Sequence, residues 1–349
     1  MKRKIIYLAL ALLLIVFLSC SKTETPSTPS PSAPVVSDIV HWTQVTVTTP
    51  FTAADWNTAL VYNNKMWLIG GRNSSGDTIA EVWSSTNGAD WTLVTGNAAF
   101  GPRFRHSSVV YNNKMWVIGG SDVNSQGGPS LNDVWYSTNG ADWILATGNA
   151  EFTPRFSFIA FNFSGKLWVM SGYTDGWNYT DDIWNSSDGV TWTQVTSGEE
   201  FLHRNASGSV VFNNKMWIIG GGRNIDESYY GNSYYWGDND VWSSSNGIDW
   251  ECVTGNAGFM PKTAHSVCAA DGKIFVYGGI GYYDYPIDPT DDLWYSSDGK
   301  FWTLVTWQMT GTPRIRARML VYDGKIWLLG GSTCAGPGSC PTSEVWYAD

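Results

Sequence analysis

The chain is built from short apolar runs bounded by Gly, Asn and Asp, and this pattern returns about every 50 residues. In one copy, strand-like runs cover residues 107–111, 114–118, 133–137 and 143–147. A glycine pair follows the second run, and an Asn-Gly turn typical of tight hairpins links the third run to the fourth. Each copy therefore predicts four short strands, and the fixed period predicts a repeat architecture.

Tryptophan marks equivalent positions in the copies and fixes their number. The second run of each copy carries Trp67, Trp116, Trp168, Trp217 and Trp327, with Phe275 in the fifth copy. The third run carries Trp83, Trp135, Trp184, Trp242, Trp294 and Trp346, and the fourth carries only Trp91, Trp143, Trp192, Trp250 and Trp302. The missing fourth-run tryptophan lies at the other end of the chain, as Trp42.

We therefore expect the strand at residues 41–47 to pair beside Val345 and Trp346 and to complete the last unit. The pattern predicts an all-β, six-bladed β-propeller of four-stranded blades over residues 41–349. A ring closed by strand exchange leaves few exposed sheet edges, and exposed edges would otherwise pair with strands of other chains.

Four features of the copies resemble the Kelch repeat. They are Pro-Arg before the first strand, Gly-Gly after the second, Asn-Asp-Val-Trp leading into the third, and Trp opening the fourth. The turns between third and fourth strands (SSTNGADW, NSSDGVTW, YSSDGKFW) also resemble degenerate Asp-box hairpins of sialidase-type propellers. The resemblance covers about 300 residues and implies a propeller of the galactose-oxidase-like superfamily. It also implies a rival function, because bacterial Kelch proteins include a sialic acid epimerase.

The first 40 residues differ from the repeats in composition. Residues 1–20 combine a basic start with an apolar run that ends at Leu18, Ser19 and Cys20, which resembles a bacterial lipobox. We expect a lipoprotein signal peptide, lipidation of Cys20, and a cell-envelope location, with attachment to the outer membrane through this anchor. Residues 21–40, rich in Pro, Ser and Thr, are expected to form an extended tether.

Composition and charge exclude some partners. The formal net charge is −10, and removing residues 1–19, which contain three bases and no acid, changes it to −13. Nucleic-acid binding depends on clustered Lys and Arg, so no nucleic-acid partner is expected. The 21 Trp and 37 Gly are typical of aromatic strands and tight turns.

The loops between second and third strands vary, and together with the links between blades they are expected to form one face of the ring. Variable loops on a rigid scaffold are where binding sites concentrate, so we expect the ligand there. A regular set of bases enters this face at Arg103, Arg155, Arg204, Lys262 and Arg314. Each third strand also has an acid, then Val, Ile or Leu, then tryptophan. These acids are Glu81, Asp133, Asp182, Asp240, Asp292 and Glu344.

Two interpretations of the bases remain open. They form a cationic ring suited to a carboxylate or an acidic peptide, or each pairs with an acid of its own blade. Regular recurrence favours pairing. Bases outside this register are better candidates for ligand specificity: Arg105, His106, His203, His265, Arg316 and Arg318.

Aromatic loops of the third to fifth blades are a second set of binding candidates: Trp177, Tyr179, Tyr230, Trp236, Tyr283 and Tyr285. Flat aromatic rings stack on sugar rings and suit protein contacts. The alternative is that these loops pack on themselves.

Cysteine spacing predicts a disulfide between Cys334 and Cys340, which flank five residues in one loop of an exported protein. Cys252 and Cys268 are expected to be separate buried thiols. The sequence has no G-x-S-x-G elbow, P-loop or zinc-like His spacing, so no catalytic residue, cofactor or metal is predicted.

The sequence therefore predicts a monomeric, membrane-anchored, non-catalytic module that binds a glycan or a protein through its loop face. The first alternative is a carbohydrate-active enzyme similar to the sialic acid epimerase. The second is a purely architectural envelope protein.

Overall fold

The computed structural model describes residues 41–46, 49–122, 129–196, 200–224, 235–281, 289–306, 308–334 and 340–348. The predicted signal peptide, Cys20 and tether lie outside these residues. Among the described residues, no helix is long and apolar enough to cross a membrane.

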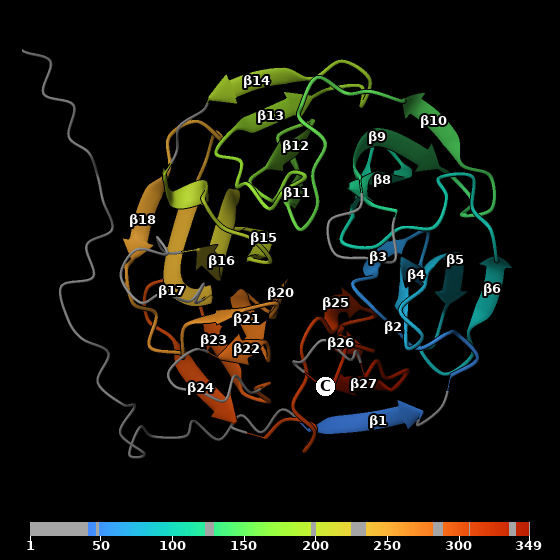
Figure 1. The fold of residues 1–349 in the computed structure, drawn as a ribbon. Helices are drawn as coiled ribbons and strands as arrows, with labels where there is room; N and C mark the ends of the chain where they lie inside the picture. The colour runs from blue at the N-terminus through green and yellow to red at the C-terminus, as the bar shows by residue number, and fades with distance from the viewer. Residues whose placement is uncertain are drawn as a thin grey trace, which may run out of the picture.

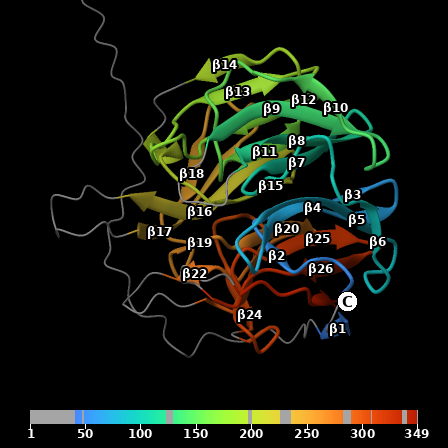
Figure 2. The same ribbon diagram turned by 45° about the vertical axis from the view of Figure 1, so that its right-hand side comes forward.

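Six antiparallel sheets are arranged around a central axis, as the pattern of runs predicts (Figures 1 and 2). Blade 1 contains β3 (Thr58–Tyr62), β4 (Lys65–Asn73), β5 (Thr78–Ser85) and β6 (Thr92–Thr95), with β2 (Ala54–Asp55) added to the end of β4. Blade 2 contains β7 (Ser107–Tyr111), β8 (Lys114–Ser121), β9 (Ser130–Ser137) and β10 (Ile144–Thr147). Blade 3 contains β11 (Ile159–Phe163), β12 (Lys166–Met170), β13 (Ile183–Ser186) and β14 (Thr193–Thr196), followed by the 3-10 turn η1 (Glu200–Leu202).

The second half of the chain repeats this order. Blade 4 contains β15 (Gly208–Phe212), β16 (Lys215–Asn224), β17 (Tyr235–Ser244) and β18 (Glu251–Thr254). Blade 5 contains β20 (Ser266–Ala270), β21 (Lys273–Tyr277), β23 (Leu293–Ser296) and β24 (Thr303–Thr306). The short strands β19 (Lys262–Thr263) and β22 (Ile280–Gly281) pair with each other, and β19 also pairs with β17, so they join blades 4 and 5.

Blade 6 confirms the predicted strand exchange. Its strands are β25 (Arg318–Tyr322), β26 (Lys325–Leu329), β27 (Val345–Ala348) and β1 (Trp42–Thr46), which comes from the N-terminal side of the chain. β1 runs antiparallel to β27, with Trp42 opposite Ala348 and Gln44 opposite Trp346. Figure 1 shows β1 at the outer edge of the ring, beside the C-terminus.

The hydrophobic core lies between neighbouring blades. Between blades 1 and 2, Leu60, Trp67 and Ile69 pack against Met115, Val117 and Trp143. The Trp67 indole N–H donates to the Tyr62 carbonyl oxygen at 2.9 Å, and the equivalent tryptophans of four other blades make the same bond.

The turns between third and fourth strands contribute to this packing. Gly140, in the turn of blade 2, lies directly against the Trp67 ring of blade 1, so that a Cβ at this position would overlap the ring. Gly88, Gly189, Gly247 and Gly299 lie in the same way against Trp327, Trp116, Trp168 and Trp217. These glycines therefore lock one blade onto the previous one in addition to turning the chain.

The regular set of bases forms buried ion pairs inside single blades. Arg155 contacts Asp182 at 2.6 Å, Arg204 contacts Asp240 at 2.8 Å, and Lys262 contacts Asp292 at 2.7 Å. Arg103 pairs with Asp133 and Arg314 with Glu344 in the same way.

These five basic side chains are at most 3% exposed, and each paired acid also accepts a bond from the tryptophan two residues later. This geometry supports the pairing interpretation over ligand binding for Arg103, Arg155, Arg204, Lys262 and Arg314. Removing one partner of such a pair leaves a buried, uncompensated charge, which is strongly destabilising.

Candidate functional site

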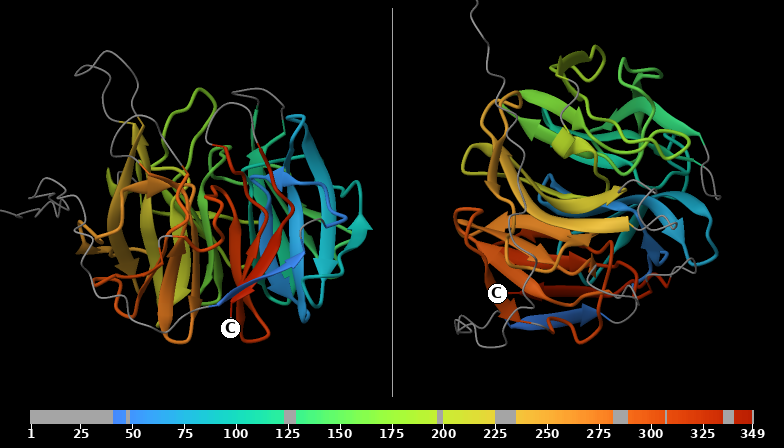
Figure 3. Two further views of the ribbon diagram at one scale, coloured as in Figure 1. Left: turned by 90° about the horizontal axis from the view of Figure 1, so that it is seen from below. Right: turned by 60° about the vertical axis from the view of Figure 1, so that its left-hand side comes forward.

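The first strands of the six blades are next to one another around the axis and form the wall of the central channel (Figure 1). In Figure 3 the strands of all blades run along this axis, so loops form the two faces of the ring. The links that enter the first strands bring one residue from each blade to the channel mouth, two positions after the regular base.

These six residues have left-handed backbone conformations, with φ between 47° and 60°: Trp56, Arg105, Ser157, Ala206, Ala264 and Arg316. Their backbones form a chain of hydrogen bonds from blade to blade. Arg105 N–H donates to the Trp56 carbonyl at 3.1 Å, and Arg316 N–H donates to the Ala264 carbonyl at 2.8 Å. Ser157, Ala206 and Ala264 make the three links between them. Left-handed backbone at bulky residues is strained and tends to cluster at functional sites.

The six residues, which we call the mouth ring, differ sharply in size around the channel. Trp56, Arg105 and Arg316 belong to the adjacent blades 1, 2 and 6, whereas Ser157, Ala206 and Ala264 belong to blades 3, 4 and 5. All six line a cavity of about 270 Å³. The cavity therefore has a cationic and aromatic wall on one side and small residues on the other.

Arg105 and Arg316 both lie over the Trp56 ring, with guanidinium-to-centroid distances of 4.5 and 4.4 Å. Arg316 also donates to Asp55 at 2.6 Å, and Arg318 Nε donates to the Asn57 carbonyl at 2.7 Å. Burial, opposed by Asp55, lowers the pKa of Arg318 to about 10. Among the off-register bases of the sequence, Arg105, Arg316 and Arg318 therefore converge on one wall.

Arg105 has a different environment from the paired bases. Its guanidinium is surrounded by aromatic rings, at 5.1 Å from Phe104, 5.3 Å from Phe156 and 5.3 Å from Trp177. Within the described part of the chain, its side chain has no hydrogen-bond acceptor or ion-pair partner. Burial, followed by repulsion from Arg316 and Arg72, lowers the pKa of Arg105 to about 9. The group is still charged at neutral pH, and no carboxylate of the described residues forms an ion pair with it.

Among the described residues, Asp55 is the carboxylate that pairs with an arginine of this wall, and it is fully buried and does not line the cavity. Besides Arg316, it contacts Arg72 at 3.6 Å. Asp55 therefore orients two arginines from behind the wall. It is not placed to contact a ligand in the cavity.

Two buried histidines also line the cavity. His106 Nε2 lies 3.0 Å from Thr58 Oγ1, and His265 Nε2 lies 3.1 Å from the Ile219 carbonyl oxygen. Burial lowers the pKa of both, that of His265 to about 3, so both rings are neutral at pH 7.

Several buried polar atoms of the lining have no hydrogen-bond partner among the described residues. They include Trp56 Nε1, Arg105 Nε, His106 Nδ1, Ser108 Oγ, Ser207 Oγ and His265 Nδ1. Each of these atoms is sealed from solvent, so it lies within the wall and out of reach of a ligand in the cavity.

The aromatic loop of blade 3 packs largely on itself. Trp177 contacts Phe156 at 5.3 Å and Tyr173 at 5.4 Å, and the hydroxyls of Tyr173 and Tyr179 are 2.7 Å apart. Trp177 is half-buried, does not line the cavity, and contacts Arg105 of the site at 5.3 Å.

The remaining sequence candidates are placed as follows. His203 is exposed on the rim, 3.3 Å from Asp181. Tyr230, Tyr283 and Tyr285 lie outside the described residues, as does the side chain of Trp236.

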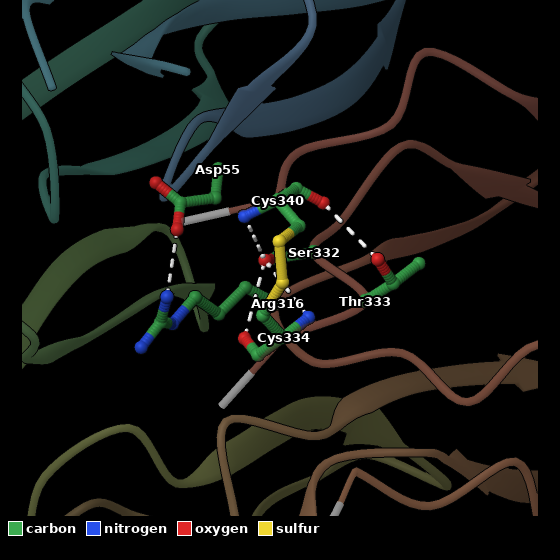
Figure 4. Close-up of a disulfide and its surroundings, with 6 residues drawn as sticks. All are labelled: Asp55, Arg316, Ser332, Thr333, Cys334 and Cys340. Carbon is green, nitrogen blue, oxygen red and sulfur yellow. Dashed lines mark hydrogen bonds and ion pairs between the residues drawn. A yellow bond between two sulfur atoms is a disulfide. The ribbon is translucent and has the colours of Figure 1, made fainter. Parts of the chain in front are cut away.

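The predicted disulfide between Cys334 and Cys340 is confirmed, with a Cα–Cα distance of 5.3 Å (Figure 4). Cys268 is a buried free thiol, as expected, and burial raises its pKa to about 12. The expectation of a free thiol at Cys252 is wrong, because this residue is disulfide-bonded. Its strand was expected to be remote from other cysteines, and the sequence offered no signal against that.

Trp56 and Asp55 were missed by the sequence analysis. The first repeat has Ala54 where the other repeats have the paired base, at the same distance from the second-strand aromatic, so Trp56 is in register with Arg105 and Arg316. Only charged side chains were considered at this position, so the tryptophan was not recognised as part of the site. Among the described residues, no cluster of His, Cys, Asp or Glu could hold a metal ion.

Comparisons with known proteins agree with this architecture. The profile of the KLHDC2/KLHL20/DRC7 Kelch-repeats domain matches residues 36–221, more than half of the chain. A solved structure, that of YjhT, aligns with a TM-score of 0.66 and 14% identity over 86% of this chain and 96% of that chain, which shows a shared fold. No curated protein sequence matches. Six four-stranded blades, the recurring motifs and the profile match together establish that this chain belongs to the KLHDC2/KLHL20/DRC7 Kelch-repeats family.

Proposed function

We propose that the protein binds a small carboxylate-bearing ligand, such as an acidic sugar or the acidic end of a glycan, in the channel mouth. The observation that carries this proposal is Arg105, a charged guanidinium that lines the cavity without an acceptor among the described residues. Arg316 and Arg318 line the same wall. A carboxylate would supply the missing counterion and accept charge-assisted hydrogen bonds.

The opposite half of the mouth ring leaves room for the uncharged part of the ligand. Ser157, Ala206 and Ala264 are small, and a cavity of about 270 Å³ lies between them and the arginines. The hydroxyls of Ser157 and Ser209, two half-buried residues of the cavity lining, are suited to bond ligand hydroxyl groups. The combination favours a polar, hydroxylated ligand over an apolar acid.

Binding without catalysis fits this geometry better than an epimerase-like reaction. General acid–base catalysis requires a group within hydrogen-bond reach of the substrate and with a pKa near the working pH. Asp55 is buried behind the wall and paired with Arg316, and a pKa of about 3 makes His265 a weak base. A purely architectural role would not account for the isolated charge of Arg105.

A direct test compares D-glucuronate with D-glucose by isothermal titration calorimetry, because these sugars differ only in the carboxylate. We expect glucuronate to bind and glucose to bind much more weakly than glucuronate. N-acetylneuraminate is titrated in parallel, and exchange between its anomers is followed by NMR. Equal binding of glucose and glucuronate, or no binding of any acid, would refute the proposal, and accelerated anomer exchange would favour the enzymatic alternative.

We further propose that the mature chain begins at a lipidated Cys20 and is held at a bacterial membrane by this anchor. The basic start, the apolar run and the lipobox-like end of residues 1–20 support the proposal. Mass spectrometry of the Cys20 peptide from the native host tests it. A diacylglyceryl thioether is expected, whereas a disulfide at the same sulfur contradicts the anchor, because one sulfur cannot carry both.

A further inference from the structure

The junction between blades 6 and 1 differs from the other five junctions of the mouth ring. At the others, one backbone N–H of the ring donates to the carbonyl of the neighbouring blade. At this junction, side chains connect the blades: Arg316 to Asp55 at 2.6 Å, Arg316 over the Trp56 ring, and Arg318 to the Asn57 carbonyl. The position of Arg316 therefore depends on side-chain contacts and on the segment that carries it.

That segment is bonded to blade 5, through Arg316 N–H and the Ala264 carbonyl among others, and on its other side to a short loop closed by the disulfide. Ile315 and Ser332 exchange two backbone hydrogen bonds, of 2.9 and 2.8 Å, directly beside Arg316. Ser332 is fully buried; its hydroxyl oxygen accepts from Cys340 N–H at 3.1 Å, and its O–H donates to the Cys334 carbonyl oxygen at 3.3 Å. Figure 4 shows the disulfide, Ser332, Arg316 and Asp55 together.

The other blades provide a comparison for this arrangement. Phe104 and Ser121, Phe156 and Tyr173, and Asn205 and Gly222 form equivalent bridges between link and loop. In blade 3, ring packing and the paired Tyr173 and Tyr179 hydroxyls hold the loop. In blade 6, a covalent bond between Cys334 and Cys340 has this role.

We propose that the Cys334–Cys340 disulfide positions Arg316 at the channel mouth, so that ligand affinity depends on its redox state. The affinity part rests on the proposed function. Reduction by a dithiol transfers two electrons and two protons to the S–S bond, giving two thiols, while the reductant is oxidised to its own disulfide. Without the bond, the loop gains conformational freedom, and the hydrogen bonds of Ser332 that fix Ile315 are weakened.

The first experiment measures positioning without any ligand. The Cys334→Ser/Cys340→Ser double variant is used in place of reductant alone, because the Cys252 disulfide is also reducible. Hydrogen exchange is compared at residues 313–318, with the blade 3 segment 154–159 as internal control. We expect roughly tenfold faster exchange of the Ile315 amide in the variant and no change in blade 3. Unchanged exchange at both segments would overturn the proposal.

The second experiment tests whether the effect on affinity passes through Arg316. Glucuronate affinity is measured in a double-mutant cycle that combines the Cys334→Ser/Cys340→Ser change with Arg316→Met. We expect the cysteine change to weaken binding roughly three- to tenfold in the wild type and to have little effect in the Arg316→Met background. Equal effects in both backgrounds would show a general structural role and contradict the inference.

A third arm covers poor folding of the serine variant. Wild-type and Cys252→Ser proteins, folded in oxidised form, are reduced under native conditions and assayed in the same way. Faster exchange at Ile315 in both supports the proposal, and its absence in both contradicts it. If the oxidised wild type binds no glucuronate, the proposed function fails, while the exchange experiment still decides whether the disulfide positions Arg316.

Discussion

Substitution of Arg105 by Met separates ligand binding from stability more cleanly than any other change at the mouth ring. Methionine keeps a long apolar side chain among Phe104, Phe156 and Trp177 and removes only the charge. A matched control is Arg155→Met, which removes the same group from a blade interior where Arg155 contacts Asp182 at 2.6 Å.

The magnitudes follow from the two environments. A pKa of about 9 for Arg105, against an ordinary 12.5, means that the charged form is disfavoured by several kcal/mol, at about 1.4 kcal/mol per pH unit. Removing this charge should therefore leave the free energy of unfolding unchanged to within about 1 kcal/mol, or increase it. A hydrogen bond to a charged group contributes about 1.5–3 kcal/mol, so glucuronate affinity should fall roughly 10- to 100-fold.

The control is expected to behave in the opposite way. Arg155 holds the pKa of Asp182 below its ordinary value against the opposing effect of burial, and neither side chain lines the cavity. Arg155→Met should cost about 3–5 kcal/mol of unfolding free energy, because Asp182, which is only 14% exposed, is left without its partner.

Calorimetric titration with glucuronate and urea unfolding measure the two quantities on the same preparations. The reasoning fails if Arg105→Met binds glucuronate as tightly as the wild type, or if it is destabilised as much as Arg155→Met. Either result would show that Arg105 has a structural role like that of the paired bases.

Three further predictions concern pH and packing. Glucuronate affinity should be constant between pH 7 and 8 and decrease above about pH 9, because unliganded Arg105 loses its proton there; a profile without this decrease would exclude Arg105 as the anchor. For His265, the folded pKa of about 3 lies below the ordinary 6.5, so its contribution to stability is present above pH 6.5 and is lost by about 1.4 kcal/mol per pH unit as pH falls toward 3. Urea unfolding at pH 7 and pH 5 should show that His265→Gln loses less unfolding free energy between these pH values than the wild type does. An identical loss in both proteins would show that His265 does not cause this pH dependence. Gly140→Ala should lower the free energy of unfolding by about 1–3 kcal/mol more than Gly101→Ala, because both glycines have φ near 77° but only Gly140 lies against Trp67; equal costs would show that backbone strain alone is responsible.

The architecture was predictable because each repeat carries its own markers. One tryptophan per strand type made the missing fourth strand visible, and Trp42 was the residue left over to fill it. Regular recurrence of the bases favoured internal pairing, and the ion pairs of the five blades have that arrangement.

The candidate site was only partly predictable. Arg105, Arg316 and Arg318 stood out because they break the repeat, and the structure places them on one wall. Their shared partner Trp56 was hidden, since bulky residues are rarely expected at positive φ and the first repeat lacks its base. The cavity depends on residues from six blades that the sequence separates by dozens of positions.

The strand exchange also makes the blade at which the chain starts arbitrary, because the ring itself is closed. Trp42 lies opposite Ala348 in an antiparallel pair. In a chain that starts at β1, a short turn like those of the other blades would therefore join the end of β27 to the start of β1. New termini would then fit at any of the turns between third and fourth strands. The natural sequence is thus one of several circular permutations compatible with the same propeller. Each permutation would close the ring by strand pairing in a different blade.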